Sequence, residues 1–188
     1  ILLPFAISVP ANAVNMLDVF IGSMPTTVMI VLASVFAANA IIFGFNISEL
    51  NLINIYIIVI FSVLVGYWIF NKYPSRVFSG DTGSLMVGAA IGAIAVMGHL
   101  EVVMIVSLIP FIMNSFGIIS SLKGFVERHN MPAKATVMTS DWKLKANKDH
   151  RAPITLTGLI LQEGPLHETD VVRSFNILTI ISGLLTIV

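Results

Sequence analysis

The sequence contains no cysteine and few charged residues, since only 11% of its 188 positions are Asp, Glu, Lys or Arg. The absence of cysteine excludes disulfide bonds and thiolate metal sites. The ten basic and ten acidic residues balance, so the chain has no excess positive charge with which to bind nucleic acid. Soluble domains carry roughly 25% charged residues, so this composition is not typical of a protein surrounded by water.

Apolar residues replace the missing charge, because 56% of the chain is hydrophobic and the mean hydropathy is +0.94. One core of this size cannot bury so many apolar side chains, which indicates that the surrounding solvent is a lipid bilayer. We therefore predict an all-α polytopic membrane protein with about six transmembrane helices of about 20 residues each. The expected spans are 1–17, 25–45, 51–70, 84–99, 102–122 and 171–188.

The hydrophilic segments predict the organisation of the chain. Residues 1–122 are expected to form transmembrane helices with cytoplasmic loops at 18–24 and 71–83, residues 123–170 a cytoplasmic substrate-binding loop, and residues 171–188 a final helix that could be truncated. All ten basic residues fall on the side of these loops or at its edge. The positive-inside rule makes that side cytoplasmic.

Two further features concern the long loop and the start of the chain. Residues 135–143 and 154–161 are enriched in Thr, Val and Ile and separated by polar residues, which predicts a small β-hairpin. The chain opens with Ile1 inside an apolar stretch that no basic residue precedes. This is not a signal peptide, and we expect the chain to be part of a longer protein.

The first polar motif is Asn12-Ala-Val-Asn15-Met-Leu-Asp18. Its two asparagines are three residues apart and share a helix face that Asp18 continues. Amides and a carboxylate at a helix end could bind a sugar, a base or a hard cation through oxygen. The alternative is a helix end whose amides only form bonds between helices.

The second motif is Ser79-Gly-Asp81-Thr-Gly-Ser84, directly before an apolar run. Its glycines let backbone amides approach a ligand closely, and helix N-termini favour anions. Asp81 is then either a helix N-cap or a magnesium ligand beside a phosphate site. No Gly-Lys-Ser/Thr follows, so the motif is not a P-loop.

The third motif is Glu127-Arg128-His129, in the long hydrophilic loop. Arg128 offers a bidentate fork for phosphate. His129 can donate to a phosphate or act as an acid or base. The alternative is a charged segment beside the membrane that only follows the positive-inside rule.

Together the motifs resemble those of the polyprenyl-phosphate N-acetylhexosamine-1-phosphate transferases, a family of membrane enzymes. The chain is similar to the C-terminal half of such an enzyme. Arg-His-x-x-Pro and Gly-Pro-Leu-His-Glu look more like the dolichyl-phosphate branch, and the triple histidine of the muramoyl branch is absent. The matching segments, in the family's order, are Asn12–Asp18, Arg76–Ser84, Pro110–Asn114, Arg128–Pro132 and Gly164–Glu168.

The resemblance implies Mg²⁺-dependent transfer of N-acetylglucosamine-1-phosphate from UDP-N-acetylglucosamine to a polyprenyl or dolichyl phosphate, with release of UMP. This is the first step of lipid-linked oligosaccharide synthesis. Mn²⁺ could replace Mg²⁺, and UDP-N-acetylmuramoyl-pentapeptide is the alternative donor within the family. The protein would lie in the plasma membrane of a prokaryote or in the endoplasmic reticulum membrane, with its active site on the cytoplasmic face. A homodimer is compatible with the chain, although nothing in the sequence shows one.

The resemblance also assigns roles to residues. Asp81 and Asn15 would be catalytic and would bind the metal, and His129 would also be catalytic. The residues expected to bind substrate are Asn12, Asp18, Asn114, Arg128 and His129.

The sequence departs from the family pattern in two respects, and two rival functions are compatible with it. The Asp-Asp motif of the family belongs to the missing N-terminal half, and Val19 and Ile21 stand where the family has Gly and Asn or Asp. One rival is a non-catalytic membrane scaffold formed by a half-protein. The other is a transporter fragment, which would place Asp18 and Asp81 at the middle of the membrane.

Overall fold

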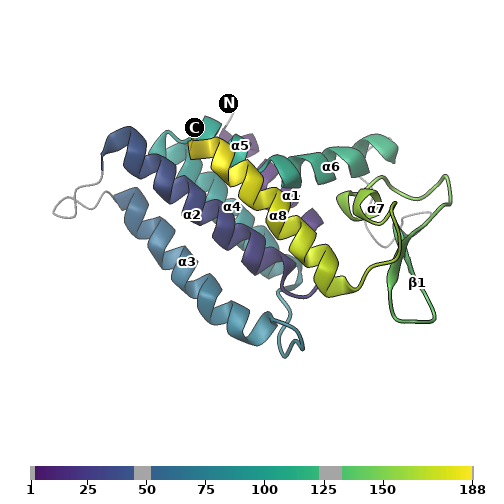
Figure 1. Ribbon diagram of the computed structural model, residues 1–188. Helices are drawn as coiled ribbons and strands as arrows, with labels where there is room; N and C mark the ends of the chain where they lie inside the picture. Colours follow the sequence, from purple (N-terminus) through teal and green to yellow (C-terminus); the bar gives the residue numbers. More distant parts are fainter. Residues whose placement is uncertain (1–2, 45–51, 123–132, 188) are drawn as a thin grey trace.

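The structure is a computed structural model that describes residues 3–44, 52–122 and 133–187. Apolar helices lie side by side in a bundle, and a small polar lobe extends from one end (Figure 1). The all-α polytopic class is confirmed, with a single two-stranded sheet in the described part of the chain. In chain order the elements are α1 (Leu3–Leu17), α2 (Ser23–Phe43), α3 (Leu52–Asn71), α4 (Gly80–Gly98), α5 (Glu101–Ser107), α6 (Ile109–Ser121), β1 (Thr136–Met138), β2 (Leu144–Ala146), α7 (Leu156–Ile160) and α8 (Glu168–Ile187).

The number of spans differs from the six expected. Within the described residues, α2, α3, α4 and α8 are each long and apolar enough to cross a membrane. The expected span 102–122 is not one straight helix, because α5 and α6 meet at an angle of 70°. They form either a broken span or a re-entrant loop, and α1 is a shorter apolar helix of 15 residues.

Proline explains the break between α5 and α6. Pro110 stands in the first turn of α6, and proline has no N–H to donate to the carbonyl four residues before it. That carbonyl belongs to Val106, and it accepts a hydrogen bond from the hydroxyl of Ser182 on α8. A second hydroxyl contact of 2.9 Å joins Ser107 to Thr186. Helix α8 therefore supplies polar partners at the place where the α5–α6 backbone is interrupted.

Two glycines bring α4 close to α1. A Cβ atom added at Gly88 would lie 2.6 Å from both the Pro10 oxygen and the Ala11 Cα atom. A Cβ atom at Gly92 would lie 2.5 Å from the Ala6 oxygen, the carbonyl that Pro10 leaves without its usual helical donor. Small residues four apart let membrane helices approach at backbone distance, so only glycine fits these two positions.

Helix α2 lies between α3 and α8 (Figure 1). The α2–α3 contact contains a buried hydrogen bond of 2.6 Å from the Asn39 amide to the Asn54 side-chain oxygen. Helix α3 otherwise has little cover, since only 22% of its apolar window is buried inside the protein. Exposed side chains such as Val63 and Ile69 make this face suited to lipid.

The polar lobe comprises residues 133–167 and contains the predicted hairpin, with different strands. Strands β1 and β2 are antiparallel, with Thr136 opposite Ala146 and Met138 opposite Leu144. The expected second strand at 154–161 is wrong, because that segment forms helix α7. Thr155 caps this helix by accepting a hydrogen bond of 2.9 Å from the Gly158 amide, and a Thr N-cap outweighs the strand propensity of the flanking residues.

Candidate active site

Two side-chain hydrogen bonds join the end of α1 to the start of α4. The Ser84 hydroxyl donates to the Asn15 side-chain oxygen at 2.8 Å, and the Ser79 hydroxyl donates to the Asp18 carboxylate. Both bonds bring together polar residues that are more than sixty positions apart in the chain. The side chains of Asn15, Asp18, Ser79, Asp81 and Ser84 are called the polar centre below.

Asp81 lies in the first turn of α4 and is exposed. The helix begins at Gly80, so Asp81 follows the capping position, and the N-cap alternative is wrong. The Asp81 side chain forms no hydrogen bond or ion pair with the part of the chain that the structure describes. A carboxylate here is favoured by the positive end of the α4 dipole, and its oxygens remain available to a ligand.

Two loops are held against each other beside the polar centre by the Asn71 side chain. Its oxygen accepts a hydrogen bond of 3.0 Å from the Gly22 amide, and its amide donates to the Val77 carbonyl at 2.8 Å. Asn71 is buried at the end of α3. It therefore links the α1–α2 loop to the α3–α4 loop, which carries Ser79 to the start of α4.

Helix α8 reaches the same α1–α2 loop through Glu168. The Glu168 carboxylate accepts a hydrogen bond of 2.7 Å from the Ile21 amide, although the two residues are 147 positions apart. The backbone of Ile21 is thus part of the structure around the polar centre. Its side chain, which departs from the family pattern, makes no contribution to this bond.

Asn114 connects α6 to two other elements and is almost fully buried, with 3% of its surface exposed. Its amide donates to the Met16 carbonyl at 3.1 Å, and its oxygen accepts from the Leu156 amide at 2.9 Å. Both ends of the side chain are therefore occupied by protein. Asn114 therefore ties α7 to the last turn of α1, and its predicted contact with substrate stays a prediction.

Of the remaining predicted site residues, the structure describes Asn12 but not Arg128 or His129. Asn12 is exposed on α1, and its amide donates to the Ser8 carbonyl of the same helix at 2.8 Å. It shares a helix face with Asn15, as the spacing predicts, but no hydrogen bond joins the two. Arg128 and His129 lie outside the described residues, so their predicted roles stay predictions.

The placement of the two aspartates bears on the transporter alternative. Asp18 follows the last residue of α1, and Asp81 stands in the first turn of α4. Both therefore lie at helix ends, where the polar loops meet, and not at mid-helix as ion coupling within the membrane would require.

The polar centre can bind Mg²⁺ only if substrate and water supply some of the ligands. Among the described residues, no three His, Asp or Glu side chains gather closely enough to hold a metal by themselves. Mg²⁺ is typically bound by one or two carboxylates together with water and substrate phosphates. Asp81 can supply one carboxylate, and the Asn15 oxygen, which has a second lone pair beside its bond to Ser84, can supply or orient another ligand.

Several residues of this region were missed by the sequence reasoning. Asn71 and Glu168 have no local pattern that predicts their distant partners. Ser79 and Ser84 belong to the second sequence motif, but no sequence pattern predicts their hydrogen bonds to Asp18 and Asn15. Gly88-x-x-x-Gly92 did carry a signal, because glycines at this spacing in an apolar segment predict close helix contact.

The fold and the polar centre define this protein as an integral membrane helix bundle with polar residues gathered where several loops meet. Comparison with known proteins gives the family. Residues 1–99 match Glycosyl transferase family 4. The chain belongs to this family, the polyprenyl-phosphate hexosamine-1-phosphate transferases that the motifs indicated.

Individual relatives are bacterial. The chain is 30% identical over 152 residues to the phospho-N-acetylmuramoyl-pentapeptide-transferase of Oceanobacillus iheyensis, which covers 80% of this chain and 45% of the relative. It is 29% identical over 163 residues to the Bacillus subtilis protein of the same name, covering 86% and 48%. The chain spans less than half the length of these relatives. Both relatives are named for the muramoyl substrate, whereas the Arg-His and Gly-Pro-Leu-His-Glu motifs resemble the dolichyl branch.

Proposed function

We propose that a protein containing this chain transfers an N-acetylhexosamine-1-phosphate from a UDP-sugar to a polyprenyl phosphate and releases UMP. The observation that carries the proposal is the position of Asp81. It is exposed in the first turn of α4, and Ser84 and Ser79 tie that turn and the residues before it to Asn15 and Asp18. One substrate lies in lipid and the other in water. A carboxylate at the end of an apolar helix is accessible to both.

In the proposed reaction an oxygen of the acceptor phosphate attacks the β-phosphorus of the UDP-sugar. The bond from that phosphorus to the bridging oxygen breaks, and UMP leaves with the bridging oxygen. Phosphoryl transfer depends mainly on positioning and on neutralising negative charge. Mg²⁺, when bound, would supply part of that neutralisation, and Asp81 and Asn15 would hold it.

The chain's own residues would hold the reacting groups. Asp81 would bind the metal on the solvent side of α4, and Asn15 would stay in place because Ser84 fixes its oxygen. Asp18, oriented by Ser79, would contact the uridine or sugar, and Asn12 on α1 would contribute to the same substrate. Arg128 and His129 would contact the phosphates, so Arg128→Ala should raise the KM for the UDP-sugar.

An apolar groove offers a path for the lipid substrate. It has a volume of about 190 Å³ and lies between α1, α4, α5 and α6, with Phe5, Val9 and Met104 among its lining residues. It extends along α1 to Ala13, two residues before Asn15. We assign this groove to the polyprenyl chain, because apart from Glu101 its lining residues are apolar and it follows α1, the helix that carries Asn15.

For the donor, we propose UDP-N-acetylmuramoyl-pentapeptide, since the bacterial relatives are named for that substrate. UDP-N-acetylglucosamine is the second candidate, favoured by Arg128-His129 and by the absence of a triple histidine after Leu166. Both donors would enter from the cytoplasmic face, where the basic loops lie.

The test is magnesium-dependent UMP release by the longest natural form of the protein, with the 188-residue chain alone beside it. Each donor is supplied with a polyprenyl phosphate. We expect release by the long form, and we expect Asp81→Asn to reduce kcat roughly 100-fold or more, the scale of losing one electrostatic contact to the transition state.

Asp141→Asn is the matched control, because Asp141 is also exposed and lies in the hairpin of the polar lobe. It should leave kcat unchanged. Normal turnover by a folded Asp81→Asn protein would remove Asp81 from the active site, and no release from any donor would favour the scaffold alternative.

A further inference from the structure

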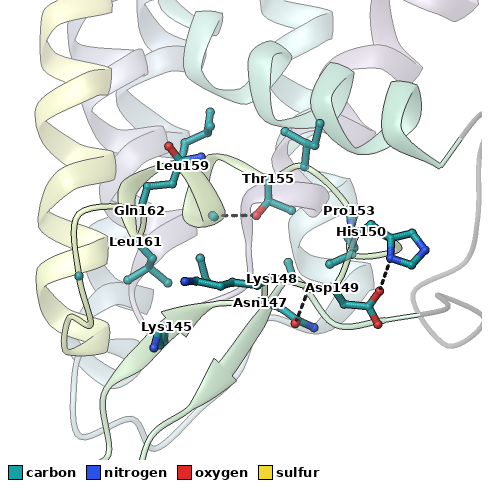
Figure 2. Close-up of a pocket in the computed structure, with 16 residues that line it drawn as sticks. Lys145, Asn147, Lys148, Asp149, His150, Pro153, Thr155, Leu159, Leu161 and Gln162 are labelled. Carbon is teal, nitrogen blue, oxygen red and sulfur yellow. Dashed lines mark hydrogen bonds and ion pairs between the residues drawn. The ribbon is translucent and has the colours of Figure 1, made fainter.

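The polar lobe contains an open pocket that is separate from the polar centre. It has a volume of about 480 Å³ and lies between the end of the hairpin, the segment that follows it and α7 (Figure 2). This is within the range of about 300–1,000 Å³ typical of ligand sites. Its polar wall includes Lys145, Asn147, Lys148 and Gln162.

The pocket wall is positively charged, because its one acidic side chain is paired with an arginine and its two lysines are not paired with any described residue. Asp149, the acidic residue of the wall, forms a bidentate pair with Arg151, with distances of 2.9 and 3.2 Å. This hydrogen bonding lowers the pKa of Asp149 to about 2. Lys145 and Lys148 form no ion pair among the described residues, so their charges are available to an anionic ligand.

The pocket is fixed to the polar centre by two routes. On one side, Leu144 of β2 pairs with Leu166 through backbone hydrogen bonds of 2.8 and 3.0 Å, and Glu168, two residues later, binds the α1–α2 loop. On the other side, Leu156 is bound to Asn114, which is bound to Met16. The two routes therefore connect the pocket to Ile21 and Met16, which lie within three residues of Asp18 in the sequence.

A third attachment joins the lobe to α6. The Ile154 amide donates to the Ser121 hydroxyl at 3.0 Å. The Ile154 carbonyl lies so close to Gly117 that a Cβ atom there would be 2.7 Å from it. The pocket is thus built on the membrane bundle, and its position relative to the polar centre is set by the fold.

We propose that this pocket binds the carboxylate-bearing peptide that the donor sugar carries, with Lys145 and Lys148 as the contacts for its carboxylates. The inference rests on the proposed function and names the part of the donor that distinguishes it from an unsubstituted UDP-sugar. A five-residue peptide extends at most roughly 17 Å, which gives it reach beyond the polar centre. Asn147 and Gln162 supply amides for its backbone.

The experiment compares two donors that differ only in charge. One is UDP-N-acetylmuramoyl-pentapeptide, and the other is the same molecule with its peptide carboxylates converted to amides. The protein is the longest natural form, in nanodiscs of neutral lipid. The variant Lys145→Gln/Lys148→Gln should raise the KM for the charged donor about tenfold, the scale of two partly exposed charge contacts, and leave the KM for the amidated donor unchanged.

Lys134→Gln/Lys143→Gln is the matched control, because it removes two positive charges from the same lobe outside the pocket. It should change neither KM. Equal effects of the two double variants, or equal effects on the two donors, would overturn the proposal and indicate a general charge effect.

A binding arm keeps this inference separate from the proposed function. The free acidic pentapeptide, labelled with a fluorophore, is titrated against the same nanodiscs without any nucleotide. Binding that the pocket variant weakens and the control variant does not would support the pocket even if no donor releases UMP. Binding that neither variant changes, or the absence of binding, would overturn it.

Discussion

The contact between α1 and α4 is built differently at its two ends. Along the apolar part, Gly88 and Gly92 place the α4 backbone directly against Pro10 and Ala6, without a side chain from α4 between them. At the polar end, Ser84 reaches across to Asn15 with a hydrogen bond of 2.8 Å. The same pair of helices is therefore held by backbone contact in one region and by side-chain hydrogen bonds in the other.

The difference follows from the surroundings of each region. In lipid the hydrophobic effect does not drive helices together, so van der Waals contact between closely packed small residues has to provide the attraction. Where the helices meet the loops, water and substrate can compete for polar groups, and a hydrogen bond fixes orientation more than it adds stability. The apolar part should therefore govern folding, and the polar end should govern activity.

The largest expected effect comes from filling the backbone contact. Gly88→Ala/Gly92→Ala adds two methyl groups that meet backbone atoms at 2.5–2.6 Å, and overpacking of this kind should lower the free energy of unfolding by about 3 kcal/mol or more. Unfolding in detergent micelles, followed by circular dichroism, measures the loss.

Gly66→Ala on α3 is the control, because nothing lies within 4 Å of a Cβ atom at that position. It should be neutral or stabilising by up to about 1 kcal/mol, since alanine favours a helix over glycine. Equal effects at the two sites would show that the α1–α4 contact does not depend on glycine.

The next effect concerns the attachment of the polar lobe. Asn114→Ala leaves the Met16 carbonyl and the Leu156 amide without their partner, and unpaired buried groups cost about 1–3 kcal/mol. We expect faster tryptic cleavage within residues 133–167 while the helical bundle stays intact. Ser115→Ala, whose hydroxyl bonds only within α6, should not change the cleavage rate, and equal rates for both variants would contradict this role of Asn114.

A smaller effect is expected at the polar end of the α1–α4 contact. Ser84→Ala removes the bond to Asn15 and should cost about 1 kcal/mol. If that bond positions Asn15, kcat falls while the KM for the donor stays nearly constant. Ser62→Ala, an exposed serine of α3 bonded to its own helix, should change neither value. A normal kcat for Ser84→Ala would mean that Asn15 is positioned by other contacts.

The smallest effect lies in the lobe, where Arg151 holds the pKa of Asp149 at about 2, below its ordinary 3.8. Because the pKa is lowered by folding, the pair stabilises the lobe above about pH 4 and loses this contribution as the pH falls toward 2. Arg151→Gln should return the pKa toward 3.8, as measured by carboxyl NMR. Arg173→Gln, which breaks a pair on α8, should leave the Asp149 pKa at its low value.

The sequence by itself determined the class of the protein and the placement of two of its predicted site residues at helix ends. Composition and run length depend only on local residues, and they predicted the apolar helices and the placement of Asp18 and Asp81 at helix termini. The same local reasoning failed at residues 154–161, where a Thr N-cap outweighed strand propensity. It also missed the 70° break, although Pro110 marked its position.

The tertiary structure alone decided which residues meet. Asn114 bonds to a carbonyl 98 positions away, and Ser84 to an amide oxygen 69 positions away. No periodicity encodes such partners, because a buried polar group only requires some partner and the packing of the helices chooses which one. For that reason the sequence named Asn114 only as a substrate-binding residue, which stays a prediction, and the structure adds that Asn114 holds α7 against the last turn of α1.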